Sequence, residues 1–320
     1  MYSTTGLAVS DSVTSYNTAF WYITGISLFL LAGLTLTMLY FVYRYNKKRN
    51  KVATQIEGST ILEVTWTVIP ILLALSMFHY GWVGWEPLSK PPKDAMTVTS
   101  VARMWNFSFN YENGKQNAEL VVPVNKPVKI NLMSLDVIHS LFIPAFRIKL
   151  DIVPGRQKVM WFLPRVEGKY DIFCAEYCGL SHSNMRSSVI VLSQKKFDKW
   201  YIDTTKVSLV SSKAGPAAEG DAIMKVKGCF VCHSTDGSRL VGPSYLNLWG
   251  SKQKLLRDGN EATVTVDEAY VTRSIYEPNA DIVKGYPKNL MQSFNGVVSK
   301  DDLTKIFAYL KSLNESNAPQ

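Results

Sequence analysis

Hydrophobic positions divide the chain into two long apolar runs followed by a more polar stretch. The run from Phe20 to Tyr43 has 24 residues without a charge, and the run from Val64 to Trp85 has 22. At about 1.5 Å per residue, each is long enough to cross a hydrocarbon layer roughly 30 Å thick. Aromatic residues gather at the ends of both runs, as in an interfacial belt. We therefore predict two transmembrane helices, over about 20–43 and 64–85, rather than buried core helices.

Basic residues are concentrated between these two runs. Five Lys and Arg lie between Arg44 and Lys51, whereas residues 1–43 contain none. The positive-inside rule places this connection in the cytoplasm, so the N-terminus and everything after Trp85 lie on the outer, periplasmic side. Either a signal peptide has been removed or the N-terminal tail is translocated with the first helix, and both remain open.

The remainder of the chain changes character twice. Residues 91–203 form the next domain, in which the stretch from Ala95 to Leu192 looks like a β-sandwich. Residues 204–218 are rich in Ser, Ala, Lys and Thr and predict a linker. Residues 219–320 form a further module. Its last part is apolar at helical spacing from Leu303 to Leu313. Together with residues 1–90, which hold the tail and the two helices, this gives three domains and a linker.

The net charge of +9 is unevenly placed. Residues 90–213 carry 18 Lys and Arg against 10 Asp and Glu, whereas residues 215–320 carry 12 of each. We interpret the basic excess as a solvated face and expect no nucleic-acid partner.

A cluster of soft metal ligands lies between Cys174 and Met185. Cys178 and His182 fall within it, and His139 lies 35 residues before Cys174. Thiolate, imidazole and thioether together suit copper, and a mononuclear blue-copper site needs only one cysteine. The second thiolate predicts two coppers. Zinc remains an alternative because two Cys and two His form a closed tetrahedral set, in which Met185 has no role. A disulfide is a second alternative.

A second redox motif lies in the C-terminal module. Cys229-Phe-Val-Cys232-His233 has the spacing of a c-type haem attachment site, in which two thiols bind the porphyrin and the histidine binds the iron. The same spacing also occurs in thiol redox pairs and half zinc sites. Met291 is the only methionine after His233 and is the candidate second axial ligand. His79, in the second apolar run, is interpreted as a packing residue, with proton chemistry as the alternative.

Three segments together resemble subunit II of the haem–copper cytochrome c oxidases. They are Asp136-Val-Ile-His139-Ser, the stretch from Lys149 to Arg156 with its Pro154-Gly155 pair, and the cysteine loop. Ala175 replaces a common serine and Leu141 a common aromatic residue, and neither change removes a ligand. The resemblance implies a binuclear CuA centre bridged by both loop cysteines, and a magnesium at the Glu176 carboxylate, facing subunit I. The implied CuA ligands are His139, Cys174, the Glu176 carbonyl, Cys178, His182 and Met185.

The segment around Met291, from Gly285 to Phe294, resembles the axial-methionine loop of class I cytochromes c. The two resemblances together imply a caa3-type subunit, in which a cytochrome c is fused to the copper domain. The implied fold is a membrane-anchored multidomain chain. It has a transmembrane two-helix hairpin, a cupredoxin-like antiparallel β-barrel and an all-α class I cytochrome c domain.

The family resemblance implies a respiratory electron-transfer function. Electrons from cytochrome c, another periplasmic donor or a quinol-oxidising complex would pass through haem c and CuA to haem a in subunit I. There, oxygen is reduced to water with proton pumping. Trp105 matches the tryptophan through which electrons reach this family's copper, although plain core packing explains it too. Glu63 matches the glutamate at the mouth of a proton-uptake channel, with an ordinary interfacial carboxylate as the alternative.

Two other functions remain open from the sequence. The chain also fits the electron-accepting subunit of a CuA-containing nitric oxide reductase, or a free-standing membrane-anchored electron carrier. In each case we expect a two-pass protein of the bacterial cytoplasmic membrane, with both redox domains on the periplasmic side.

Overall fold

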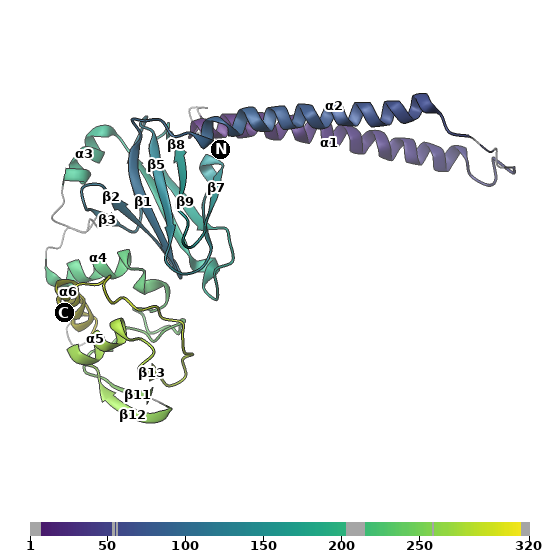
Figure 1. Ribbon diagram of the computed structural model, residues 1–320. Helices are drawn as coiled ribbons and strands as arrows, with labels where there is room; N and C mark the ends of the chain where they lie inside the picture. The colour runs from purple at the N-terminus through teal and green to yellow at the C-terminus, as the bar shows by residue number, and fades with distance from the viewer. Residues whose placement is uncertain (1–7, 53–54, 56, 203–214, 258, 315–320) are drawn as a thin grey trace.

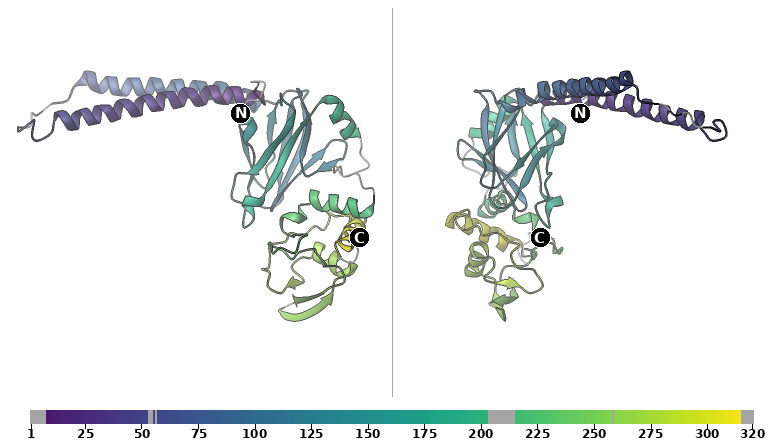
Figure 2. Two further views of the ribbon diagram at one scale, coloured as in Figure 1. Left: turned by 180° about the vertical axis from the view of Figure 1, so that it is seen from behind. Right: turned by 45° about the vertical axis from the view of Figure 1, so that its right-hand side comes forward.

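The computed structural model of the chain describes residues 8–52, 55, 57–202, 215–257 and 259–314. A long helical hairpin, a β-sandwich and a C-terminal module follow one another along the chain (Figure 1). The hairpin extends from one end of the sandwich, and the module lies against the other end in every view (Figure 2). Most of the predicted linker, up to residue 214, lies outside the described residues.

The hairpin consists of α1 (Asp11–Arg44) and α2 (Thr60–Trp85). Both helices are long and apolar enough to cross a membrane, and their most apolar stretches are not buried inside the protein. The two helices touch where the hydroxyl of Tyr22 donates to Ser76 Oγ at 2.8 Å and the Tyr22 ring packs on Tyr80. Exposing this much apolar surface to water is unfavourable, so the hairpin requires a lipid environment.

The first turns of α1 attach the hairpin to the sandwich. Val13 is fully buried, and the Ser12 hydroxyl donates to the carbonyl of Phe146 at 2.5 Å. The Asp11 carboxylate accepts two hydrogen bonds of 2.7 Å from Arg165. The helix therefore begins well before the predicted start at residue 20, because its first turns pack on protein and carry polar residues that the hydropathy pattern does not count.

The sandwich consists of two five-stranded sheets, ordered β3-β2-β1-β5-β8 and β4-β10-β9-β6-β7. Both sheets are mixed, since β1 pairs with β5 and β4 with β10 in parallel. The prediction of an antiparallel barrel was wrong in this respect. Three other strands, β2 to β4, lie between β1 and β5 in the chain, and β5 then pairs with β1 in the same direction. The bounds are β1 (Met96–Arg103), β2 (Asn106–Tyr111), β3 (Gln116–Asn117), β4 (Leu120–Pro123), β5 (Val128–Ser134), β6 (His139–Ile143), β7 (Ile148–Ile152), β8 (Lys158–Phe162), β9 (Gly168–Cys174) and β10 (Arg186–Leu192), with short helices η1 (Pro87–Ser89), η2 (Pro144–Phe146), η3 (His182–Asn184) and α3 (Gln194–Ile202).

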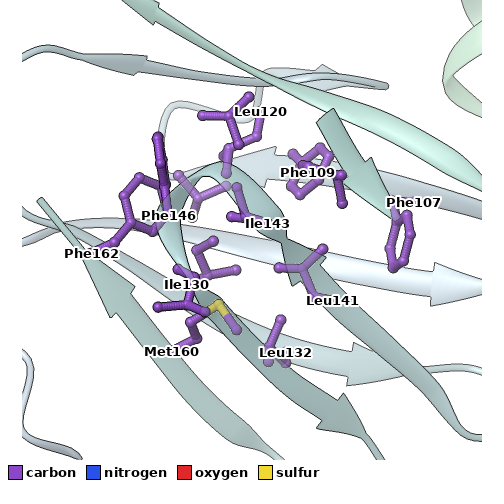
Figure 3. Close-up of a cluster of buried hydrophobic side chains, with 14 of the residues drawn as sticks. Phe107, Phe109, Leu120, Ile130, Leu132, Leu141, Ile143, Phe146, Met160 and Phe162 are labelled. Carbon is purple, nitrogen blue, oxygen red and sulfur yellow. The ribbon is translucent and has the colours of Figure 1, made fainter. Parts of the chain in front are cut away.

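The core of the sandwich forms from the inward positions of facing strands (Figure 3). Val128, Ile130 and Leu132 of β5 are fully buried and alternate with half-exposed residues, as the twofold period of a strand requires. Each such side chain contributes about 1.5–3 kcal/mol through burial. Leu141 of β6 and Ile172 of β9 belong to the same core, so the strands that carry the candidate metal ligands are held by fully buried neighbours.

The C-terminal module packs α4 (Pro216–Val226) against α6 (Lys300–Ser312). A capping box begins α6, in which Ser299 and Asp302 exchange hydrogen bonds with each other's backbone N–H. The module also contains a three-stranded sheet, so the all-α expectation was wrong. Two antiparallel strands of this sheet form a hairpin, and its turn contains Gly259 at φ +83°. The remaining elements are η4 (Cys229–Val231), β11 (Lys252–Arg257), β12 (Asn260–Thr265), α5 (Glu268–Tyr276) and β13 (Ile282–Val283).

A buried carboxylate ties this sheet to α5 and predicts an acid sensitivity. Asp281 accepts hydrogen bonds of 2.6 and 3.0 Å from Arg257 and lies 3.5 Å from Arg273 Nε. The hydrogen bond from Arg257 holds its pKa below the usual value of 3.8. Because the folded pKa is depressed, the stabilisation is present above about pH 4 and is lost as the pH falls through the folded value.

We expect Asp281→Asn to destabilise the module by about 1–3 kcal/mol at neutral pH and to flatten its acid unfolding curve. Urea unfolding of the full chain, followed at neutral pH and below pH 4, measures both effects. Asp267→Ala removes the N-cap hydrogen bond of α5 without touching this ion pair and controls for general destabilisation. Equal acid sensitivity of Asp281→Asn and the parent would contradict the assignment.

Candidate functional site

The first candidate site lies where β6, β9 and the loop before β10 meet. His139 begins β6 and Cys174 ends β9, and these strands pair so that Leu141 lies opposite Cys174. The loop returns to the sheet through a hydrogen bond of 3.1 Å from the Cys174 N–H to the Met185 carbonyl. This closure brings Cys178 and the other loop residues beside the two strand ends.

All six predicted copper ligands converge there. The sulfur atoms of Cys174 and Cys178 are 3.7 Å apart, and both cysteines are free. The ligand atoms of His139, Cys174 and Cys178 all lie within 4.8 Å of one another. The other distances are 3.9 Å from Cys174 Sγ to His139 Nδ1, 3.3 Å from Cys174 Sγ to the Glu176 carbonyl oxygen, 3.5 Å from Cys178 Sγ to His182 Nδ1 and 3.7 Å from Cys178 Sγ to Met185 Sδ.

The two thiols strongly affect each other's protonation. The hydrogen bond from Cys178 lowers the pKa of Cys174 to about 3, although burial acts in the opposite direction. The same contact, together with burial, raises the pKa of Cys178. One thiolate and one thiol therefore share a proton across the pair. Because a metal ligand must be a thiolate, a bound cation would displace that proton.

Asp136 orients the buried histidine of this cluster. Its Oδ1 lies 2.8 Å from His139 Nε2, and its two oxygens accept backbone hydrogen bonds of 2.7 Å from Met104 and Val137. Burial would raise the pKa of Asp136, but these hydrogen bonds hold it below the usual value. Because Nε2 is held by the carboxylate, Nδ1 faces Cys174 as a ligand.

We expect Asp136→Asn to weaken metal binding by about 10–100-fold, the usual cost of losing an outer-shell partner. The reason is that the amide orients His139 less strongly than the carboxylate does. Competitive titration with a chelator measures the change. Asp171→Asn, which alters an exposed carboxylate on β9, is the matched control. An unchanged affinity for Asp136→Asn would contradict this role.

The second candidate site is a cavity in the C-terminal module. Cys229, Cys232, His233 and Met291 all line it. The haem-motif residues and Met291, which the sequence analysis selected from two distant segments, therefore line one cavity. Tyr245 lines the same cavity and stacks on His233 with ring centroids 4.6 Å apart.

The neighbours of His233 fix its orientation for ligand binding. Its Nδ1 lies 2.7 Å from the carbonyl oxygen of Pro243, so the other ring nitrogen is available as a ligand. Burial lowers the pKa of His233, which keeps the ring neutral. A Cβ placed on Gly242 would lie 2.5 Å from the ring carbon Cε1, so only glycine lets the chain pass this close.

Of the other residues singled out from the sequence, Trp105 contacts the first ligand set, whereas Glu63 and His79 lie in α2. Trp105 is buried, and its indole N–H donates to the carbonyl of Cys178 at 3.0 Å. Glu63 lies in the first turn of α2, and His79 packs on Tyr80 in the same helix. Within the described residues, no contact joins Glu63 or His79 to either ligand set. The Glu176 carbonyl joins the first cluster, and its carboxylate remains a candidate magnesium ligand only.

Sequence reasoning did not foresee the contacts by which three residues shape the sites. Asp136 was quoted as part of a motif, but its contact with His139 was not foreseen. The i, i+3 spacing of the two residues in a turn is the signal that would have found it. The close approach of Gly242 to the His233 ring can be recognised only once the ring has been placed in the structure. Met104 lines the second cavity although it belongs to the sandwich, and no sequence signal predicts that.

Comparison with known proteins finds a family match for each of the first two domains of the chain. Residues 7–80 match the family described as cytochrome c oxidase subunit II, transmembrane domain, and residues 110–193 match its periplasmic domain. The alternative cytochrome c oxidase subunit 2 of Bradyrhizobium diazoefficiens is 30% identical over 216 residues, which cover 58% of this chain and 76% of the relative. Cytochrome c oxidase subunit 2 of Alkalihalophilus pseudofirmus is 26% identical over 298 residues, covering 88% of this chain and 83% of the relative.

A solved structure is also similar. The periplasmic domain of subunit II of the cytochrome oxidase of Bradyrhizobium japonicum is 28% identical, covers 36% of this chain and 97% of its own, and has a TM-score of 0.35. The matches to both domain families and to the Bradyrhizobium diazoefficiens relative agree on the assignment. This chain therefore belongs to the cytochrome c oxidase subunit II family, as the membrane-anchored electron-transfer subunit of a haem–copper oxidase that partners subunit I.

Proposed function

We propose that this chain is a caa3-type subunit II, which carries a binuclear CuA centre and a covalent haem c on one polypeptide. The observation that carries the proposal is the convergence of two separate ligand sets, one around Cys174 and Cys178 and one around Cys229 and Cys232. When bound, these groups supply the one-electron chemistry that connects a donor to haem a in subunit I, where oxygen is reduced with proton pumping.

The first ligand set favours copper over zinc. Met185 Sδ lies 3.7 Å from Cys178 Sγ, and a thioether is a soft ligand that suits copper. Both thiols lie at the centre of the cluster, each near one imidazole, so the set would offer enough soft donors to hold two copper ions. Asp136 fixes the tautomer of His139, as outer-shell carboxylates do at metal sites.

The second ligand set supports a covalent haem. Cys229 and Cys232 would form the two thioether bonds, and His233 and Met291 would be the axial ligands. Pro243 orients the histidine, and the largely apolar lining of the cavity favours a porphyrin over a solvated zinc ion. Neither family match extends beyond residue 193, so this assignment stands on the motif and the cavity.

Three further roles complete the proposal. Trp105 would connect the surface of the sandwich to the copper loop, which its hydrogen bond to the Cys178 carbonyl supports. Glu63 would receive protons at the cytoplasmic end of α2, and the Glu176 carboxylate would hold a magnesium against subunit I. The redox domains would lie on the periplasmic side of a bacterial inner membrane, as the basic connection between the helices suggests.

The external donor would be cytochrome c, another periplasmic carrier or a quinol-oxidising complex, and it would meet the C-terminal module. Tethering gives the module an effective concentration of roughly millimolar at the copper domain. A separate docking face for a soluble donor is then unnecessary, which agrees with a basic excess on residues 90–213. The module itself is neutral by the same count.

Electron paramagnetic resonance of the full chain in mild detergent, with copper and haem counts, tests this proposal. Two coppers that share one unpaired electron, together with one low-spin haem, are expected. A single copper with one thiolate, zinc in its place or the absence of covalent haem would overturn the corresponding half. A nitric oxide reductase would give the same spectra, so the chain purified with its large subunit must also be assayed for oxygen and for nitric oxide reduction.

A further inference from the structure

The C-terminal module contacts the sandwich through the turn between β1 and β2. The guanidinium carbon of Arg103 lies 3.9 Å from the centre of the Phe294 ring, and Nη2 donates to the Ser293 carbonyl at 3.4 Å. Arg103 is 9% exposed although it carries a charge. A cation held over an aromatic face away from water forms one of the stronger non-covalent contacts of this type.

A second contact lies at the end of α4. Asn106 Nδ2 donates to the carbonyl of Val226 at 2.9 Å, which satisfies a carbonyl in the last turn of that helix. The chain then turns at Gly228 with φ +78°, and a Cβ there would lie 2.5 Å from the Cβ of Asn106. Lys227 Nζ donates to Gln116 Oε1 of the sandwich at 3.1 Å. The backbone of the module at Gly228 therefore packs directly against the Asn106 side chain of the sandwich.

Electrostatic attraction between opposite charges does not explain this contact. Between described residues, every ion pair found lies on one side of the interface, and none joins the sandwich to the module. Arg103 and Lys227 carry the same charge, and burial lowers the pKa of each. Apolar contacts also join the two parts: Val231, Val241 and Leu290 of the module pack against the sandwich core.

The contact also contributes to the wall of the cavity that His233 and Met291 line. Met104 of the sandwich lines that cavity, and its backbone N–H donates to Asp136, which holds His139. Its sulfur lies 3.5 Å from the position that a Cβ on Gly179 of the copper loop would occupy. One side chain thus contacts both the wall of the second cavity and the loop of the first site.

We propose that the module is docked on the sandwich by a latch without ion pairs, formed by Arg103 on Phe294 and by Asn106 on the end of α4. Because its contacts are cation–π, hydrogen-bonded and apolar, the docked state is insensitive to ionic strength. Docking holds Met104 between the cavity of the module and the copper loop, so electrons from the module would cross to the copper loop at this contact. The docking stands on contacts alone, whereas its consequence for electron flow rests on the proposed function.

Hydrogen exchange of the full chain in detergent tests the latch, at low and high salt. We expect the backbone amides of residues 220–231 and 101–108 to show the same protection at both salt concentrations. Arg103→Ala should speed their exchange about tenfold, since a desolvated cation–π contact holds the interface closed. Lys126→Ala removes an exposed positive charge of the sandwich and should change nothing.

Phe294→Leu provides a second variant in the module, in case Arg103→Ala impairs folding of the sandwich. It keeps the apolar volume and removes the ring face, and the double variant should show little additional effect because both changes remove one contact. Loss of protection at high salt in the parent, or unchanged exchange in both single variants, would overturn the latch. The haem absorbance of each sample reports separately on the proposed function, so the two failures are distinguishable.

Discussion

Replacing Cys178 by serine is expected to abolish the proposed binuclear copper centre. This sulfur lies near three other ligand atoms, those of Cys174, His182 and Met185, so its loss removes the atom that connects the cluster. Serine is a poor ligand for copper in comparison with a thiolate. Losing an outer-shell partner already costs up to about 100-fold in affinity or activity, and we expect a larger loss here.

Copper per chain and the paramagnetic resonance spectrum measure this effect, together with oxygen consumption in the assembled oxidase. Tyr177→Phe is the matched control because this neighbour in the same loop is 76% exposed and is not a ligand. The control should keep two coppers and full activity. Two coupled coppers in Cys178→Ser would show that this thiol does not bridge them.

Replacing both Cys229 and Cys232 by alanine is expected to remove the proposed covalent haem while leaving the proposed copper site intact. The two thiols lie in the wall of a cavity within the module, separate from the cysteine loop of the sandwich. If electrons reach the copper pair through the module, oxygen consumption with the native donor should then fall by more than about tenfold, because tethering a module beside its target raises effective binding by about 10²–10⁴-fold.

Haem retained on a denaturing gel and copper counts measure the two parts of this prediction. Thr235→Ala, at an exposed position just after the motif, should keep the haem. Oxygen consumption at the full rate in the double variant would show that the donor reduces the copper domain directly. Loss of copper as well would show that the module is needed to fold the sandwich.

The helical hairpin and the ligand sets could be predicted because their signals are local. A charge-free run long enough to cross a membrane indicates a helix without any tertiary information, and α1 and α2 confirmed both runs. The start of α1 at Asp11 could not be predicted in this way, since Val13 is buried only by the sandwich that it contacts. The sheet in the module was missed because the search there followed helical spacing.

The sequence itself determined which residues are candidates at both sites, through the residue types and short spacings between Cys174 and Met185 and between Cys229 and His233. Only the tertiary structure decided how those residues are oriented. Asp136 holds His139, and Pro243 holds His233, through contacts that depend on the course of the backbone. The parallel pairing of β1 with β5 depends on the same long-range course.

The docking of the module on the sandwich was likewise decided only in three dimensions. Arg103 and Phe294 are far apart in the chain, and neither residue type indicates a partner by itself. Charge patterns gave no signal, because no ion pair between described residues crosses this interface. A sequence reveals ligands through the chemistry of each side chain, whereas contacts between surfaces depend on shape, and shape exists only after the chain has folded.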